Sequence, residues 1–282
     1  MKTKTATVPP IKVLLLCVLC LTASPSRSQT YEECISQGLA AANQQHYDEA
    51  INHFQQALRL SPDDIRNALT HSNIAHIQEV KGEPMKALDS YEMALAIAPL
   101  NVPILLSRAN LYMRLGNLNK AAIDYGNILD VDPNHTDAML QRAYIYQQRR
   151  DFDKARQDYE RLLALQPDNY AAQLGMAILL QNMGKPQDAL TRLATLIDQH
   201  PNRAELYSVR AEIEAEAHQP ELALMDLDKA ITLSPDDRNL ILTRAYLHLH
   251  QGNKHLARKD FMRAIELGVP QGQLKEELRQ CK

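Results

Sequence analysis

Six prolines recur along the chain at an almost constant spacing. They are Pro62, Pro99, Pro133, Pro167, Pro201 and Pro235, separated by 37, 34, 34, 34 and 34 residues. A fixed period of this length is the signature of stacked supersecondary units, each too small to bury its apolar face alone. The spacing therefore predicts a one-dimensional array of repeats.

Other columns appear when each proline is set as position 32 of a repeat. Position 8 is small, position 20 is always Ala, position 24 is bulky, and position 15 is Gly in four of seven repeats. Position 8 holds Gly38, Ala75, Ala109, Ala143, Ala177, Ala211 and Ala245. Position 20 holds Ala50, Ala87, Ala121, Ala155, Ala189, Ala223 and Ala257. Position 24 holds Phe54, Tyr91, Tyr125, Tyr159, Leu193, Leu227 and Phe261. The glycines are Gly82, Gly116, Gly184 and Gly252.

This combination of columns resembles the tetratricopeptide repeat, and the resemblance covers residues 31–271. It implies an all-α, right-handed superhelical solenoid of seven helix-turn-helix repeats. The expected repeats are 31–64, 68–101, 102–135, 136–169, 170–203, 204–237 and 238–271.

Each column has a physical role in a pair of helices, here called A and B. Small residues at positions 8 and 20 let the two helices approach closely. Gly at position 15 supplies the positive φ that ends helix A, and Pro at position 32 stops helix B. We expect helix A at about positions 1–14 and helix B at about 15–31, with Ile65, Arg66 and Asn67 in the loop after the first repeat.

A solenoid also needs a cap over its last repeat, because no neighbour covers that repeat. Residues 272–282 are predicted to supply it. A helix is expected over Gln273–Cys281, with Leu274 and Leu278 as its apolar stripe.

Two columns vary together and predict ion pairs inside individual repeats. Four repeats carry Arg at position 7 and Asp at position 23, and the other three carry neither residue there. The matched presence predicts that each Arg pairs with the Asp of its own repeat, where its planar fork suits a carboxylate. The pairs are Arg108 with Asp124, Arg142 with Asp158, Arg210 with Asp226, and Arg244 with Asp260.

The first 28 residues have the pattern of an export signal. Lys2, Lys4 and Lys12 precede an apolar run from Val13 to Leu21, which is shorter than the ~20 residues of a membrane span. Small side chains at Ser26 and Ser28 predict cleavage near Ser28-Gln29 and a periplasmic or secreted protein. Leu16 precedes Cys17 and Leu19 precedes Cys20, and a large residue at this place argues against a lipid anchor on either cysteine. The alternative that the segment is not cleaved and serves as an N-terminal anchor stays open.

Cleavage would leave 27 basic and 34 acidic residues, a formal charge of −7, which argues against binding nucleic acid. It would also leave two cysteines, Cys34 and Cys281. Helices stacked ~8–10 Å apart over seven repeats would hold them on the order of 60 Å apart, too far for a disulfide. Cys34 is expected in the core, and Cys281 as a free terminal thiol or an intermolecular link.

The resemblance implies that helix A lines an inner groove through positions 2, 5, 9, 12 and 13. The predicted peptide-binding residues are Leu106, Asn110, Leu140, Tyr144, Leu174, Ile178, Leu242 and Tyr246, and the sixth repeat adds Ser208 and Glu212. Such a surface suits an extended peptide or an amphipathic helix. The alternative is that some of these leucines pack against the next helix. The basic clamp by which some family members hold chaperone tails is missing from every run of three repeats.

No catalytic motif is present. The closest histidines, His248, His250 and His255, are poorly spaced for one metal ion, and no phosphate loop or CxxC pair occurs after residue 28. We therefore expect a non-catalytic scaffold or adaptor outside the cytoplasm that binds a protein or peptide and needs no cofactor or metal. The alternatives are an assembly factor docked to outer-membrane or secretion machinery, and a self-associating protein that forms a homodimer through an end repeat.

Overall fold

The computed structural model describes residues 29–282, in which all regular structure is helical. The α-helices are α1 (Tyr31–Asn43), α2 (Tyr47–Leu60), α3 (Asn67–Val80), α4 (Pro84–Ile97), α5 (Val102–Arg114), α6 (Leu118–Val131), α7 (Thr136–Gln148), α8 (Phe152–Leu165), α9 (Tyr170–Asn182), α10 (Pro186–Gln199), α11 (Ala204–Glu216), α12 (Pro220–Leu233), α13 (Arg238–His250), α14 (Lys254–Glu266) and α15 (Lys275–Gln280). A 3₁₀ turn, η1 (Gln271–Leu274), precedes α15. The predicted export signal lies outside the described residues.

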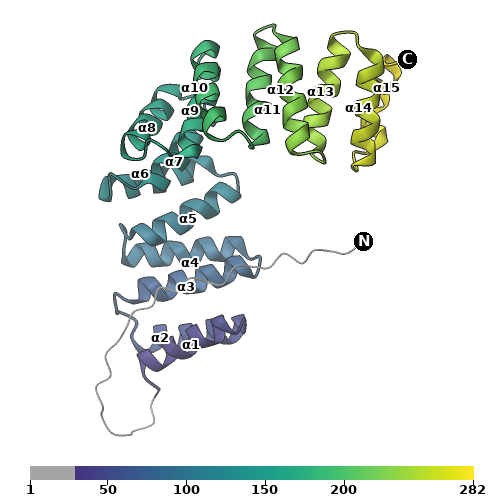
Figure 1. Cartoon of the computed structure of the whole chain (residues 1–282). Coiled ribbons are helices and arrows are strands. Elements are labelled where there is room, and N and C mark those ends of the chain that lie inside the picture. Colours follow the sequence, from purple (N-terminus) through teal and green to yellow (C-terminus); the bar gives the residue numbers. More distant parts are fainter. Residues whose placement is uncertain (1–28) are drawn as a thin grey trace. The chain divides into compact units, whose positions relative to one another are not determined.

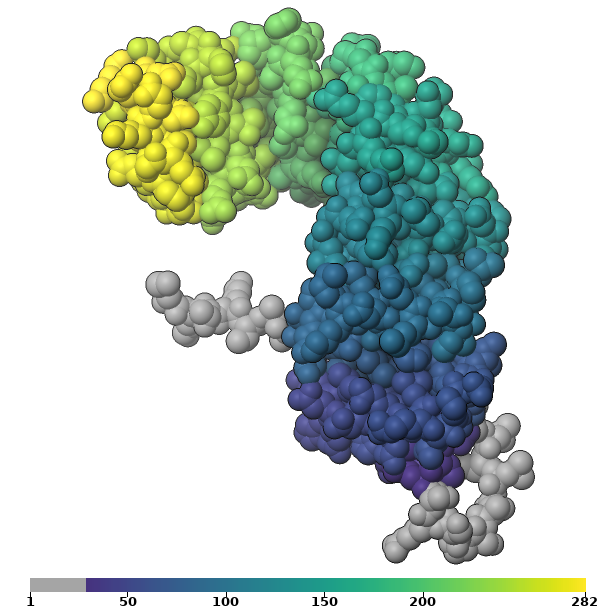
Figure 2. Space-filling model, turned by 180° about the vertical axis from the view of Figure 1, so that it is seen from behind, coloured from purple at the N-terminus to yellow at the C-terminus, as the bar shows by residue number. Residues whose placement is uncertain are grey.

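The chain divides into an N-terminal unit, described over residues 29–138, and a C-terminal unit of residues 139–282. Within each unit the odd-numbered helices are the A helices and the even-numbered ones up to α14 are the B helices (Figure 1). Within each unit, contacts run mainly between the two helices of a repeat and from a B helix to the next A helix, as from α2 to α3 and from α8 to α9. In the space-filling view the repeats within each unit follow one another in sequence order (Figure 2).

The small and bulky columns form the core of every repeat. All seven alanines at position 20 are fully buried, and the side chains at position 24 are at most 2% exposed. Close approach explains the glycine of the first repeat, since a Cβ on Gly38 would lie 2.6 Å from the Phe54 ring. The predicted packing of helix A on helix B is therefore present throughout.

Position 15 has a left-handed backbone in all seven repeats. The four glycines there have φ between 72° and 76°, and the other repeats place Gln45, Arg150 and His218 at φ 63°, 60° and 59°. Helix B then begins at position 17 and not at about 15. Pro84, Pro186 and Pro220 occupy that first position, where a proline loses no helical hydrogen bond.

The connection after the first repeat differs from the sequence-based expectation. Asn67 belongs to α3 and not to the preceding loop. It is 1% exposed, and its side-chain amide donates to the carbonyls of Ser61 and Pro62 at 2.7 and 3.0 Å. These bonds explain the early start of the helix, because they fix Asn67 against the end of helix B.

The C-terminal cap is a 3₁₀ turn followed by a six-residue helix, where one helix over Gln273–Cys281 was predicted. Leu274 is 3% exposed, and Leu278 packs on the same cluster as Val269 and Phe261. Cys281 is also buried there, and its thiol is free, which is one of the two expected states of this residue. Cys34 is fully buried in the first repeat, as predicted, and both thiols are free.

Candidate functional site

The exposed side of the A helices, here called the A-helix face, carries the residues predicted to bind a partner. Hydrogen bonds join these helices across successive repeats. In the C-terminal unit Tyr170 donates to Glu205 at 3.0 Å, and Gln181 donates to Glu216 at 2.8 Å. In the N-terminal unit Arg114 of α5 forms an ion pair with Glu79 of α3. These contacts join α9 to α11 in the C-terminal unit and α3 to α5 in the N-terminal unit.

In the N-terminal unit the two predicted residues lie on α5. Leu106 is half-buried, and Asn110 is exposed. The Asn110 side-chain oxygen accepts a 2.7 Å hydrogen bond from the hydroxyl of Tyr125, a core residue at position 24. The Asn110 Oδ1 atom is therefore hydrogen-bonded within its own repeat.

The C-terminal unit exposes two of its predicted aromatic residues. Tyr144 on α7 is 45% exposed and Tyr246 on α13 is 38% exposed. Leu140, Ile178 and Leu242 are half-buried on the same sides of their helices. These five side chains offer apolar surface to a partner.

Leu174, in contrast, is a core residue. It is 7% exposed and packs in a cluster with Leu193, Leu206 and Tyr207. The alternative that some of these leucines pack on the neighbouring helix therefore describes this position.

Tyr246 is held from two sides. Its ring meets Phe261 edge to face with centroids 5.2 Å apart, and its hydroxyl donates to Glu277 of α15 at 3.2 Å. A fixed aromatic side chain loses little conformational entropy when it binds a ligand, which makes Tyr246 a suitable anchor.

A homodimer through an end repeat was one of the expected alternatives, and the first repeat is one such end. In the structure Tyr31 and Cys34 are buried, and the exposed residues of α1 include Glu32, Glu33, Ser36 and Gln37. The end of the first repeat is consequently polar.

The four Arg–Asp pairs link helix A to helix B within single repeats. Each Arg donates through Nε and Nη2 to the two carboxylate oxygens of its Asp, at distances of 2.5–2.8 Å. The aspartates are buried, at 1–7% exposed. Arg244 also donates to Asp228 of the preceding repeat at 2.5 Å, so one of the four pairs extends across repeats. These groups are engaged in packing and are not available to a ligand.

A row of carboxylates on α11 was only partly recognised from the sequence, which singled out Glu212. Glu205, Glu212 and Glu216 are spaced by 7 and 4 residues, so they share one side of the helix. We call these three residues the carboxylate stripe. All three are exposed, and none forms an ion pair with Lys or Arg anywhere in residues 29–282. Partial desolvation and the nearby Glu216 carboxylate raise the pKa of Glu212.

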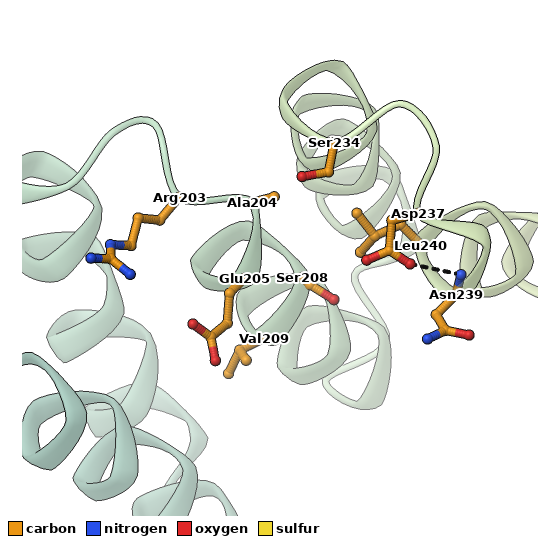
Figure 3. Close-up of a pocket in the computed structure, with 9 residues that line it drawn as sticks. All are labelled: Arg203, Ala204, Glu205, Ser208, Val209, Ser234, Asp237, Asn239 and Leu240. Carbon is orange, nitrogen blue, oxygen red and sulfur yellow. Dashed lines mark hydrogen bonds between the residues drawn. The ribbon is translucent and has the colours of Figure 1, made fainter. Parts of the chain in front are cut away.

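A cleft of about 450 Å³ opens beside the first turn of the stripe, between the start of α11 and the start of α13. Ser208 and Ser234 point toward this space, and the Arg203 guanidinium extends away from it (Figure 3). The Arg203 guanidinium lies over the Tyr170 ring, 4.3 Å from its centroid. The remaining lining includes Glu205, Asp237, Val209 and Leu240, so the cleft combines two carboxylates with apolar side chains.

Across residues 29–282, His, Cys, Asp and Glu are not gathered into any group of three that could hold a metal ion. Within the same residues each helix is too short or too polar to cross a bilayer.

Comparisons with known proteins match the repeat pattern. Three family models, each described as a tetratricopeptide repeat, match residues 31–64, 106–170 and 147–213. A tetratricopeptide repeat protein from Parabacteroides merdae ATCC 43184 has a similar crystal structure, with a TM-score of 0.72 and 30% identity over 90% of this chain and 99% of that chain.

Two more distant similarities concern proteins with stated roles. YrrB, a TPR protein with an unusual peptide-binding site, shares the fold with a TM-score of 0.56 at 22% identity, over 71% of this chain and 97% of its own. The photosystem I assembly protein Ycf3 of Cyanophora paradoxa is 34% identical over 79 residues, which is 28% of this chain and 46% of that protein. The chain thus spans about half the length of the curated relatives it matches.

Proposed function

Because the chain belongs to the tetratricopeptide repeat family, we propose that it is a non-catalytic scaffold whose A-helix face binds a peptide or helix of another protein. Proteins of this family serve as platforms for protein partners. The observation that carries the proposal is the set of exposed Tyr144 and Tyr246 beside half-buried Leu140, Ile178 and Leu242. Aromatic side chains of this kind dominate the binding energy of protein interfaces.

The buried ionisable groups support a structural role over catalysis. Asp124, Asp158, Asp226 and Asp260 are each held in a bidentate ion pair. An acid or base that is locked in this way cannot exchange protons with a substrate without breaking the packing of its repeat.

We further propose that the protein works outside the cytoplasm, on the pattern of residues 1–28. Expression of the full chain in a secreting bacterial host, followed by mass spectrometry of the intact protein, tests this. A mass that begins at Gln29 supports export and cleavage. The full-length mass in the cytoplasmic fraction would contradict it.

An assembly factor is the second candidate function. The similarity to Ycf3, a protein named for photosystem I assembly, favours it, although only 28% of this chain takes part in the match. In this role the scaffold would hold components of outer-membrane or secretion machinery while they assemble.

An affinity pull-down from an envelope extract of the source organism tests the proposed surface. One bait is residues 29–282, and a second carries Tyr144→Ser and Tyr246→Ser. The control carries Ile123→Ser and Met225→Ser, which remove two apolar side chains, 63% and 68% exposed, from the B helices α6 and α12.

A protein captured by the first bait and the control but lost from the tyrosine variant supports binding on the A-helix face. The identity of that protein separates a general adaptor from an assembly factor. Equal capture by all three baits would contradict the assignment of the face. If nothing is captured and the purified protein elutes as a dimer in size-exclusion chromatography, self-association replaces the proposal.

A further inference from the structure

We propose that the A-helix face of the C-terminal unit selects a cationic segment, with Lys or Arg side chains opposite the carboxylate stripe and apolar side chains beside Tyr246. This inference rests on the function proposed above and specifies the chemistry of the partner. It concerns residues 139–282 alone.

Charge on this face is one-sided. The helices α9, α11 and α13 contain no Lys and three Arg. Arg210 pairs with Asp226 and Arg244 pairs with Asp260. The third, Arg238, lies in the first turn of α13. The carboxylate stripe is left with uncharged hydrogen-bond donors, Tyr170 and Gln181, as its partners.

The N-terminal unit shows the contrast. Its A-helix face also holds a glutamate, Glu79 on α3. There Arg114 of the next repeat forms an ion pair with that carboxylate, and the Tyr91 hydroxyl donates to it at 2.6 Å. Glu79 is thus neutralised within the N-terminal unit, whereas α11 leaves three carboxylates to an external cation.

Two further carboxylates, those of Asp237 and Glu277, belong to the same unit as the stripe. At the start of α11, Glu205 and Asp237 line the cleft of about 450 Å³ together with Val209 and Leu240 (Figure 3). That volume and lining suit the aliphatic stem and charged end of one Lys or Arg side chain. Glu277 adds a carboxylate beside Tyr246.

The raised pKa of Glu212 fits the same picture, because burial and a like charge both disfavour its ionised form. A bound cation would relieve that cost. Apolar contacts on Ile178 and Leu242 would supply affinity, and the carboxylates would select charge and register.

A selection from random displayed peptides tests the inference without assuming a partner. Peptides of about 12 residues are long enough, since extended chain at ~3.3 Å per residue exceeds the ~20 Å length of α11. The targets are residues 29–282, a Glu212→Gln/Glu216→Gln variant, and a control with Asp188→Asn and Asp198→Asn. The control removes two exposed, unpaired acidic side chains from the B helix α10, so its change in net charge is identical.

We expect peptides selected on the unmodified protein to be enriched in Lys or Arg among apolar residues. By fluorescence anisotropy, such a peptide should bind the Gln variant about tenfold more weakly, and the Asn control should bind within about twofold. Raising salt from about 50 to about 300 mM should weaken binding to the unmodified protein and have less effect on the Gln variant.

Two other outcomes overturn the inference in distinguishable ways. Neutral or acidic peptides that lose binding on Tyr246→Ser would refute the cationic preference and leave the proposed function intact. Selected peptides that bind Tyr246→Ser and the Gln variant as tightly as the unmodified protein, or the failure to select any peptide, would count against both. Circular dichroism of every variant verifies that helical content is retained.

Discussion

Single residues at position 15 carry a backbone cost in three of the seven repeats. Gln45, Arg150 and His218 adopt the left-handed conformation that Gly adopts in the other four. A side chain with a Cβ pays roughly 1–2 kcal/mol there, because its Cβ approaches the following carbonyl. All three side chains are exposed, and helix A ends just before each of them as it does before the glycines.

Substitution of Arg150 by Gly should therefore stabilise the C-terminal unit by about 1 kcal/mol. Chemical denaturation followed by circular dichroism measures the change. The reciprocal variant, Gly184→Ala, introduces the same cost and should lower the free energy of unfolding. A destabilised Arg150→Gly would mean that the Arg150 side chain contributes more than its backbone costs.

Glu214 is a second residue with an energetic cost. It is 7% exposed, one of its carboxylate oxygens has no hydrogen-bond partner, and Arg210 approaches the other no closer than 3.9 Å. Burial and the nearby Asp226 carboxylate raise its pKa from 4.5 to about 7. A raised pKa in the folded state means that the protonated form is favoured by folding.

The stabilising effect is then complete below pH 4.5 and is lost as the pH rises through about 7. Glu214→Gln should be more stable than the unmodified protein by about 1–2 kcal/mol at pH 8 and nearly equal to it at pH 4. Denaturation across this pH range measures both values. Glu92→Gln, at an exposed position on α4, serves as the control for the loss of one carboxylate.

At the scale of the helix pair, the Arg–Asp pairs fix the register of helix A against helix B. Removing Arg108 alone would leave the Asp124 carboxylate, 1% exposed, without its cation. The expected cost is about 3–5 kcal/mol. The second repeat shows that a neutral pair fits the same place, since Ile74 and Ser90 occupy these columns and both are buried.

Arg108→Ile together with Asp124→Ser should accordingly cost less than the sum of the two single substitutions, by more than about 1 kcal/mol. A double-mutant cycle from urea denaturation provides the number. Strict additivity would show that the two groups contribute independently despite their bidentate geometry.

The helix pairs are also where sequence and structure agree best. Close packing requires specific residue sizes at positions 8, 20 and 24, so these columns could be read from the chain alone. The start of α3 could not, because it depends on two hydrogen bonds from Asn67 to carbonyls of the preceding turn. The exposure of single side chains on the A helices was harder still to predict from the sequence. Leu174 has the same column as Leu140, but its neighbours Leu193 and Leu206 bury it.

The sequence identified only Glu212 of the carboxylate stripe, for a related reason. Its three members share a side of α11 by simple helical geometry, which the sequence contains. Whether a glutamate is neutralised depends on the residue that a neighbouring repeat places beside it. That residue is Arg114 for Glu79 and Gln181 for Glu216.

At the scale of the whole chain, the repeats depend on their neighbours and the last repeat depends on its cap. Leu274 and Leu278 cover a cluster that contains Ile241, Phe261 and Val269. In a solenoid, stability is approximately a sum over repeats and the interfaces between them. The loss of the cap should therefore weaken the end of the array more than its beginning.

Deletion of residues 271–282 is expected to reduce hydrogen-exchange protection in α13 and α14 and to leave α1–α6 unchanged. Mass spectrometry of proteolytic fragments after exchange resolves the two regions. Uniform loss of protection along the chain would indicate a single cooperative unit, in conflict with stability that is distributed over repeats.

The two buried thiols supply built-in reporters of such local opening. Cys34 lies in the first repeat and Cys281 in the terminal cap, and burial raises the pKa of both thiols. An alkylating reagent can reach each sulfur only when its own end of the chain opens, so the two labelling rates measure two separate opening equilibria. The two cysteines thus report on opening at the two ends of the array. A partner that binds over one end would slow alkylation of the cysteine at that end and leave the alkylation rate of the other unchanged.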